Sequence, residues 1–164
     1  MLKLTRSLAI AALTNLLPLA TSAQKPDTVA LADLTIASLH YDSDTTAARF
    51  RLGTPPRTHR AHLRNDAGVF LTTWYYPGLI LSFGRDGHRR TAIVQGPRYR
   101  TERGVAVGDS VDRVHRLYGR PLHGDSIGLL YASSTKEFET LGITFFIQDG
   151  RVSKIMLGEV ISAE

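Results

Sequence analysis

The chain reads Thr-Glu-Arg-Gly-Val-Ala-Val-Gly-Asp-Ser-Val-Asp-Arg-Val-His-Arg-Leu-Tyr-Gly-Arg-Pro from Thr101 to Pro121, and this stretch decides the fold. Asp109 or Ser110 is placed to cap a helix by accepting hydrogen bonds from free backbone N–H groups. Gly119 can take the left-handed conformation that ends a helix, and Pro121 prevents continuation. One apolar face recurs at helical spacing and is formed by Val111, Val114, Leu117 and Tyr118.

A weaker copy of this pattern lies upstream. Ser43-Asp44 matches the cap, and Gly53-Thr54-Pro55 matches Gly119-Arg120-Pro121 at a constant offset of 66 residues. Asp86-Gly87 and Asp149-Gly150 then predict tight hairpin turns, because these turns need positive φ. Alternating or β-branched segments predict strands at Val69–Tyr76, Leu79–Phe83 and Thr91–Val94, and at Ile127–Tyr131, Ile143–Gln148 and Val152–Leu157.

These signals predict an α+β fold made of two tandem repeats. Each repeat would be a helix followed by an antiparallel β-meander, and the two meanders would form one joined sheet with the helices on one face. The first repeat is expected at residues 34–96 and the second at residues 97–164, after a lead-in linker at residues 24–33. We expect a ligand on the open face of this sheet.

The N-terminal residues 1–23 are expected to be a signal peptide. Lys3 and Arg6 precede a mostly apolar run, and Thr21-Ser22-Ala23 offers a cleavage site. The alternative is a retained amphipathic helix. The chain has no cysteine, which excludes disulfides and a lipid-modified cysteine. We therefore expect a periplasmic or secreted protein without a transmembrane segment or lipid anchor.

Positive charge is concentrated in the middle of the chain. Residues 49–103 carry a net charge of +8, and all eleven basic residues there are arginines. This distribution indicates a face that binds anions or an acidic partner. The alternative, which we favour, is a solvated surface in a protein whose source prefers arginine to lysine.

Aromatic residues beside these arginines are candidates for partner binding, because aromatic and arginine side chains often anchor interfaces. The alternative for the two aromatic residues is that they face the core. The candidate residues are Trp74, Tyr76, Arg57, Arg60, Arg64, Arg89 and Arg90.

Two patterns that imitate catalytic or metal chemistry are better explained otherwise. Gly108-Asp109-Ser110 with Asp112 and His115 resembles part of an esterase site, but both motifs fall on one helical turn and a helix cap accounts for them. His59 and His62, with His88 or Asp66, could ligate a metal, but they lie in an arginine-rich loop that opposes a cation. We assign no catalytic residue, metal or cofactor.

The order of these motifs resembles a superfamily of small exported proteins. It is similar to the outer-membrane assembly lipoproteins of the SmpA/OmlA (BamE) type and to the β-lactamase inhibitory protein, which carries two such units. The matching residues are Leu52-Gly53-Thr54-Pro55, Trp74-Tyr75-Tyr76, Leu79–Phe83, Asp86-Gly87, Val107-Gly108-Asp109-Ser110, Val114, Tyr118-Gly119-Arg120-Pro121, Tyr131, Phe145 and Asp149-Gly150.

The resemblance implies a protein that binds other proteins and is not an enzyme. We therefore expect a non-catalytic module of the bacterial envelope that binds another envelope protein. The alternative is a binder of anionic envelope molecules through the arginine-rich first repeat, and a small esterase using Ser110 and His115 is a third. No nucleic-acid partner is expected.

Overall fold

The computed structural model describes residues 28–62, 70–136 and 139–160, so the expected signal peptide and Arg64 lie outside the described residues. Its helices are η1 (Leu31–Leu34), α1 (Thr45–Leu52) and α2 (Val111–Tyr118). Its strands are β1 (Arg57–His62), β2 (Phe70–Tyr76), β3 (Leu79–Phe83), β4 (Arg89–Val94), β5 (His123–Gly124), β6 (Gly128–Lys136), β7 (Glu139–Gln148) and β8 (Arg151–Val160).

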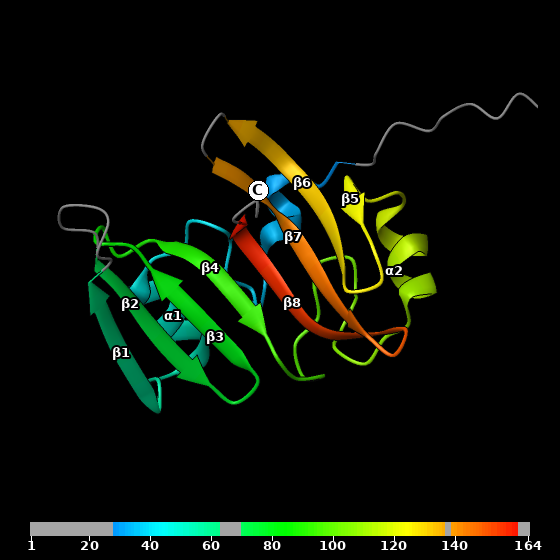
Figure 1. The fold of residues 1–164 in the computed structure, drawn as a ribbon. Coiled ribbons are helices and arrows are strands. Elements are labelled where there is room, and N and C mark those ends of the chain that lie inside the picture. Colours follow the sequence, from blue (N-terminus) through cyan, green and yellow to red (C-terminus); the bar gives the residue numbers. More distant parts are fainter. Residues whose placement is uncertain (1–27, 63–69, 137–138, 161–164) are drawn as a thin grey trace, which may run out of the picture.

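All eight of these strands belong to one antiparallel sheet in the order β1-β2-β3-β4-β8-β7-β6-β5 (Figure 1). The only α-helices of the described chain, α1 and α2, have eight residues each. The predicted fold class, two tandem helix-plus-meander repeats, is therefore wrong. The molecule is mainly one eight-stranded sheet, with two short helices added to it.

The N-terminal segment explains why separate repeats do not form. The backbone N–H of Val29 donates to the carbonyl of Ala132, 3.2 Å away in β6. Asp33 pairs with Arg103 at 2.6 Å, and Ile36 forms a bridge with Thr101. Residues expected to introduce the first repeat are thus bonded to residues expected in the second. One shared core results.

The core lies on the face of the sheet that the helices cover. Strand alternation sends every second side chain to this face, and register aligns these side chains in two rows that cross six strands. The rows are Trp74, Leu81, Ala92, Leu157, Ile143 and Tyr131, and Tyr76, Leu79, Val94, Ile155, Phe145 and Leu129. All twelve residues are buried, and they form one cluster with Ala48 of α1 and with Val114 and Tyr118 of α2.

The helix ends follow the local sequence. Ser110 caps α2 by accepting a hydrogen bond from the backbone N–H of Arg113, and Gly119 ends the helix at φ 70°. The helix predicted between Ser110 and Gly119 is confirmed. Asp44 caps α1 by accepting from the backbone N–H of Ala47, and Gly53 ends it at φ 79°.

Two glycines face each other where β7 pairs with β8. Gly142 and Gly158 are direct partners in this ladder. A Cβ on Gly158 would overlap the carbonyl oxygen of Arg90 in β4, and a Cβ on Gly142 would overlap the carbonyl oxygen of Tyr131 in β6. Because both residues lack a side chain, the backbones of β4 and β6 can lie close to β8 and β7 at this level of the sheet.

A two-residue turn before α1 holds two non-glycine residues in the left-handed region. Ala37 has φ 53° and Ser38 has φ 60°, while the backbones of Ile36 and Leu39 exchange hydrogen bonds of 2.9 and 3.0 Å across the turn. Left-handed backbone costs a residue with a side chain about 1–2 kcal/mol. The turn therefore stores strain that glycine would relieve.

We predict that Ser38→Gly raises the free energy of unfolding by about 1 kcal/mol, because glycine takes positive φ without a steric cost. Urea denaturation followed by Trp74 fluorescence measures the change. Ser82→Gly, inside β3, is the matched control and is expected to lower stability, because glycine weakens a strand interior. A stability loss in both variants would contradict the prediction.

Candidate functional site

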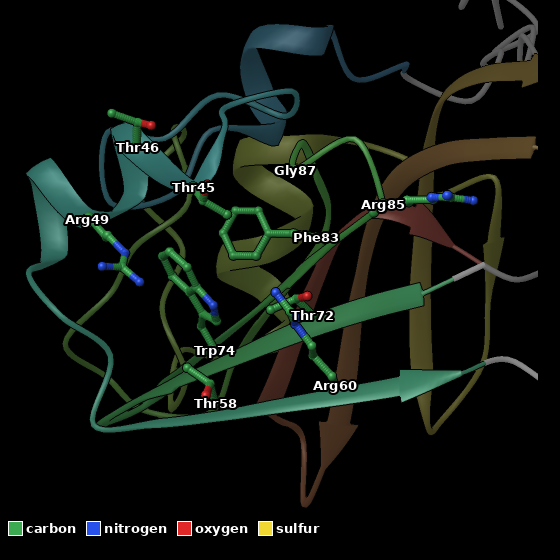
Figure 2. A pocket seen from close by; sticks show the side chains of 11 residues that line it. Thr45, Thr46, Arg49, Thr58, Arg60, Thr72, Trp74, Phe83, Arg85 and Gly87 are labelled. Carbon is green, nitrogen blue, oxygen red and sulfur yellow. The ribbon is translucent and has the colours of Figure 1, made fainter. Parts of the chain in front are cut away.

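A cleft of about 1000 Å³ opens between α1 and the β1 end of the sheet (Figure 2). Its lining residues come from α1, from the first three strands and from the turn after β3. They are Thr45, Thr46, Arg49, Thr58, Arg60, Thr72, Trp74, Phe83, Gly84, Arg85 and Gly87. The cleft lies on the helix-covered side of the sheet, and not on the open face where a ligand was expected.

The floor of the cleft is aromatic. Trp74 and Phe83 are 4 % and 1 % exposed, and their ring centroids are 4.8 Å apart in a tilted arrangement. Strand register places Thr58 opposite Trp74 and Arg60 opposite Thr72. Because directly paired residues share a face of the sheet, the β1 side chains extend the floor outward to the edge of the molecule.

Arginine side chains surround this floor. The Arg49 guanidinium lies 5.3 Å from the centre of the Trp74 ring, within the range of a cation–π interaction. Figure 2 shows Arg49 and Arg60 turned toward Trp74 from α1 and β1, while Arg85 stands farther off. All three arginines are exposed. None of the eleven lining residues carries a carboxylate.

The two nearest carboxylates in sequence already have partners. Asp44 accepts a 2.7 Å hydrogen bond from the backbone N–H of Ala47. Asp86 accepts from the backbone N–H of His88 and from Arg90 at 2.6 Å, and the His88 hydrogen bond is the main cause that lowers the pKa of the Asp86 carboxyl. The cleft can therefore offer its cations to an added anion.

This arrangement suits binding. Guanidinium groups hold carboxylates or phosphates through paired, charge-assisted hydrogen bonds. Threonine hydroxyls can donate or accept beside them, while the Trp74 and Phe83 rings, at 4 % and 1 % exposed, support the cleft from below and offer a ligand little area of their own. A cleft with an apolar floor and a few polar groups is a typical ligand site.

The structure brings two of the predicted residues, Trp74 and Arg60, into the cleft. Trp74 is buried beneath it, so a partner meets at most one edge of the ring. Arg57 takes the other sheet face, where its guanidinium lies 3.8 Å from the centre of the Tyr75 ring. Arg57 and Arg60 therefore lie on opposite faces of one strand.

The other described candidates, Tyr76, Arg90 and Arg89, make contacts within the molecule, and their role in partner binding stays a prediction. Tyr76 is 8 % exposed, and its hydroxyl donates to the carbonyl of Gly53 at 3.0 Å. Arg90 is half-buried and forms ion pairs with Asp86 and Glu159. Each of these side chains is engaged within the molecule.

Arg89 is the most deeply buried charged residue of the described chain, at 1 % exposed. Its Nε donates to the carbonyl of His40 at 3.0 Å, and its Nη2 donates to the carbonyl of Leu34 at 2.6 Å. Burial lowers the pKa of its guanidinium to about 10. Arg89 thus joins the sheet to the N-terminal segment.

Sequence reasoning missed Arg49, Arg85 and Thr58. Residues 57–62 were expected to form a loop, but they form β1 and pair with β2 along their whole length. The alternation of Thr58 and Arg60 at residues i and i+2 was the signal that both face one side. Arg49 carried no comparable signal, because its helix lacks a clear apolar stripe.

The residues of the esterase-like and metal-like motifs do not form such sites in the structure. Ser110 is the α2 cap, and its hydroxyl accepts from the backbone N–H of Arg113 at 3.3 Å. His115 is exposed and its Nδ1 lies 3.3 Å from the carbonyl of Gly119. His59 and His62 are three residues apart in a strand, whereas two ligands on one face of a strand need an even spacing.

Three tyrosines of the described chain, Tyr118, Tyr41 and Tyr76, have pKa values raised above the ordinary value, mainly by burial. Burial is the main cause that raises the pKa of Tyr118 to about 12 and of Tyr41 to about 12. Unfolded tyrosine ionises near a pKa of about 10. These groups stabilise the fold fully below about pH 10, and this contribution is lost as pH rises through the folded pKa.

We therefore predict that the free energy of unfolding falls between about pH 10 and pH 12. Arg89 acts in the opposite direction over this window, because its folded pKa is lowered, but three tyrosines with raised pKa values oppose this one arginine. Urea denaturation at a series of alkaline pH values measures the slope. Tyr118→Phe is expected to make the fall shallower, and an unchanged slope in this variant would contradict the assignment.

No family model and no curated protein matches the chain. Among solved structures, it is similar to an extracellular protein containing an SCP domain from Bacillus anthracis str. Ames, with 9 % identity and a TM-score of 0.48 over 85 % of this chain. The chain spans about half of that protein, 49 % of its length. The uncharacterized protein YfeY from Escherichia coli is also similar, with 11 % identity and a TM-score of 0.45 over 79 % of this chain and 99 % of that one.

At this level of similarity neither likeness carries an argument about function. Neither bears on the resemblance to the BamE-type and inhibitory proteins, which stays a prediction. One of the two similar structures is an extracellular protein. Within the described ranges, no helix is long and apolar enough to cross a membrane.

Proposed function

We propose that this protein is an exported, non-catalytic binding module of the bacterial envelope that holds an acidic partner in the cleft between α1 and β1. The observation that carries the proposal is that three exposed arginines, Arg49, Arg60 and Arg85, line the cleft, and that none of its described lining residues carries a carboxylate. The partner is another envelope protein, and an anionic envelope molecule is the alternative.

The charge of the cleft supports an acidic ligand over a neutral one. An exposed cluster of like charges is unfavourable unless an anion or solvent screens it. Arg49 already lies against Trp74, so less side-chain freedom is lost when it binds. The buried floor then allows part of the ligand to leave water, which strengthens the nearby charge interactions.

We predict that the double variant Arg49→Gln with Arg60→Gln weakens binding of a fluorescent oligoglutamate about tenfold or more, since each charge-assisted hydrogen bond contributes about 1.5–3 kcal/mol. Fluorescence anisotropy at low and moderate ionic strength measures the affinity. Arg116→Gln, at an exposed position on α2, is the matched control and is expected to bind as the wild type does.

Unfolding curves of all variants show whether a loss of binding reflects a loss of the fold. Equal binding by the double variant and the control would overturn the proposal. A uronic acid oligosaccharide, tested in the same way, distinguishes the two partner classes. Binding that survives moderate salt favours an aromatic-floored contact, because interactions between exposed charges alone are screened.

A further inference from the structure

Among the described strands, β1 lies at an edge of the sheet, and the cleft opens beside it. The two edge strands are β1 and β5. β5 has two residues, whereas β1 has six and pairs with β2 at every one of them. An edge strand presents unpaired backbone N–H and C=O groups to which another extended chain can bond. Of these two strands, β1 is the one long enough to do so.

The side chains of β1 disfavour some strands as pairing partners and favour others. The strand reads Arg-Thr-His-Arg-Ala-His and contains no acidic residue. A second copy of β1 paired with it would bring arginines close together, and like charges across a strand pair are destabilising. An acidic strand in the same place gains favourable cross-strand pairs on both faces of the sheet.

A strand added to β1 would have one face toward the cleft and the other toward the open face of the sheet. A strand paired with β1 lies about 4.8 Å beyond it in the plane of the sheet. Its inward residues continue the row of Trp74 and Thr58 and enter the cleft beside Arg60 and Arg49. Its outward residues lie on the open face beside Arg57, which is stacked on Tyr75.

We propose that the acidic partner binds as an extended peptide segment that adds a strand to β1 and places alternate carboxylates in the cleft. This inference rests on the proposed function and specifies its ligand. Backbone hydrogen bonds to β1 supply affinity that does not depend on sequence, and the arginines select acidic side chains at every second position.

The test uses a short synthetic peptide in which Glu and Thr alternate, and two N-methylated forms of it. Each form is methylated at one of the two sets of alternate residues, so it keeps its charge but loses one row of backbone donors. Only one row can face β1. We expect one methylated form to bind about tenfold or more weakly than the parent peptide, and the other to bind equally well. In the complex, amide hydrogen exchange of β1 is expected to slow.

The outcomes separate the two proposals. If all three peptides bind equally, and binding still depends on Arg60, the cleft binds anions without strand addition and the inference is overturned. If the uronic acid oligosaccharide displaces the peptide and binds as tightly, the partner is not a peptide strand and the inference is again overturned. If Arg49→Gln with Arg60→Gln leaves peptide binding unchanged, the proposed function itself fails.

Discussion

Replacing Gly158 by alanine is expected to lower the free energy of unfolding by about 3–5 kcal/mol, which is a large part of the stability of an ordinary domain. Gly158 has φ 111°, a conformation that residues with a side chain rarely adopt. The new Cβ would also overlap the backbone carbonyl oxygen of Arg90. Because that oxygen belongs to β4, relief requires a shift of the β4–β8 ladder.

Two other glycines separate these causes. Gly108 has φ 96°, and a Cβ added there would meet no other atom within 4 Å, so Gly108→Ala tests backbone strain alone. Gly142 lacks the positive φ but a Cβ there meets Tyr131, so Gly142→Ala tests the steric overlap alone. Urea denaturation should rank the stability losses as Gly158 first, Gly142 second and Gly108 last. Equal losses of stability at Gly158 and Gly108 would show that β4 shifts to accommodate the new Cβ without lowering the free energy of unfolding further.

Replacing Arg89 by methionine is expected to lower the free energy of unfolding by about 3 kcal/mol, since each buried carbonyl left without a donor costs about 1–3 kcal/mol. The side chains are similar in length, so the loss reports mainly the buried carbonyl of Leu34 and the partly buried carbonyl of His40, to which Arg89 donates. Removing a buried cation offsets part of the loss. Heat and urea denaturation measure the change.

The neighbouring Arg90 is the matched control. Its ion pairs with Asp86 and Glu159 lie near the surface, where its side chain is 39 % exposed. Exposed pairs contribute about 0–1 kcal/mol, so Arg90→Met is expected to have a small effect. Similar losses in the two variants would contradict the role assigned to Arg89.

Local signals were sufficient for elements whose ends are marked by special residues. The α2 helix between Ser110 and Gly119 is confirmed, and Asp149-Gly150 forms the turn between β7 and β8, with φ 52° and 70°. These features depend on residues adjacent in sequence. A capping hydroxyl or a residue tolerant of positive φ acts on the nearest backbone groups and needs no tertiary partner.

The arginine-rich edge could not be predicted in this way. Residues 57–62 contain few residues that favour strands, and they form β1 because β2 offers them a ladder. The β-propensity of single residues is a weak guide where pairing with a neighbouring strand decides the local structure. The cleft was missed for the same reason, since Arg49 and Arg60 line one cleft only when α1 and β1 lie on either side of Trp74.

Strand alternation places Trp74 and Tyr76 on one face of the sheet, but it does not say which face the helices cover. That choice depends on where the helices pack, and both residues take the covered face. The burial of Arg89 was not predicted, because arginines are usually exposed. Its burial depends on two carbonyl groups from the distant segment of Leu34 and His40, which a pattern of neighbouring residues does not reveal.

The pairing of β4 with β8 has a consequence for how the chain reaches its native state. Val94 pairs with Ile155, although α2 and three strands lie between them in the chain. Until β8 arrives, β4 has no neighbour on one side and can pair with foreign strands. Long-range pairings of this kind slow folding, because a large loop must close first. The chain is therefore most prone to aggregation during the time before β8 pairs with β4, while the β4 edge is unpaired.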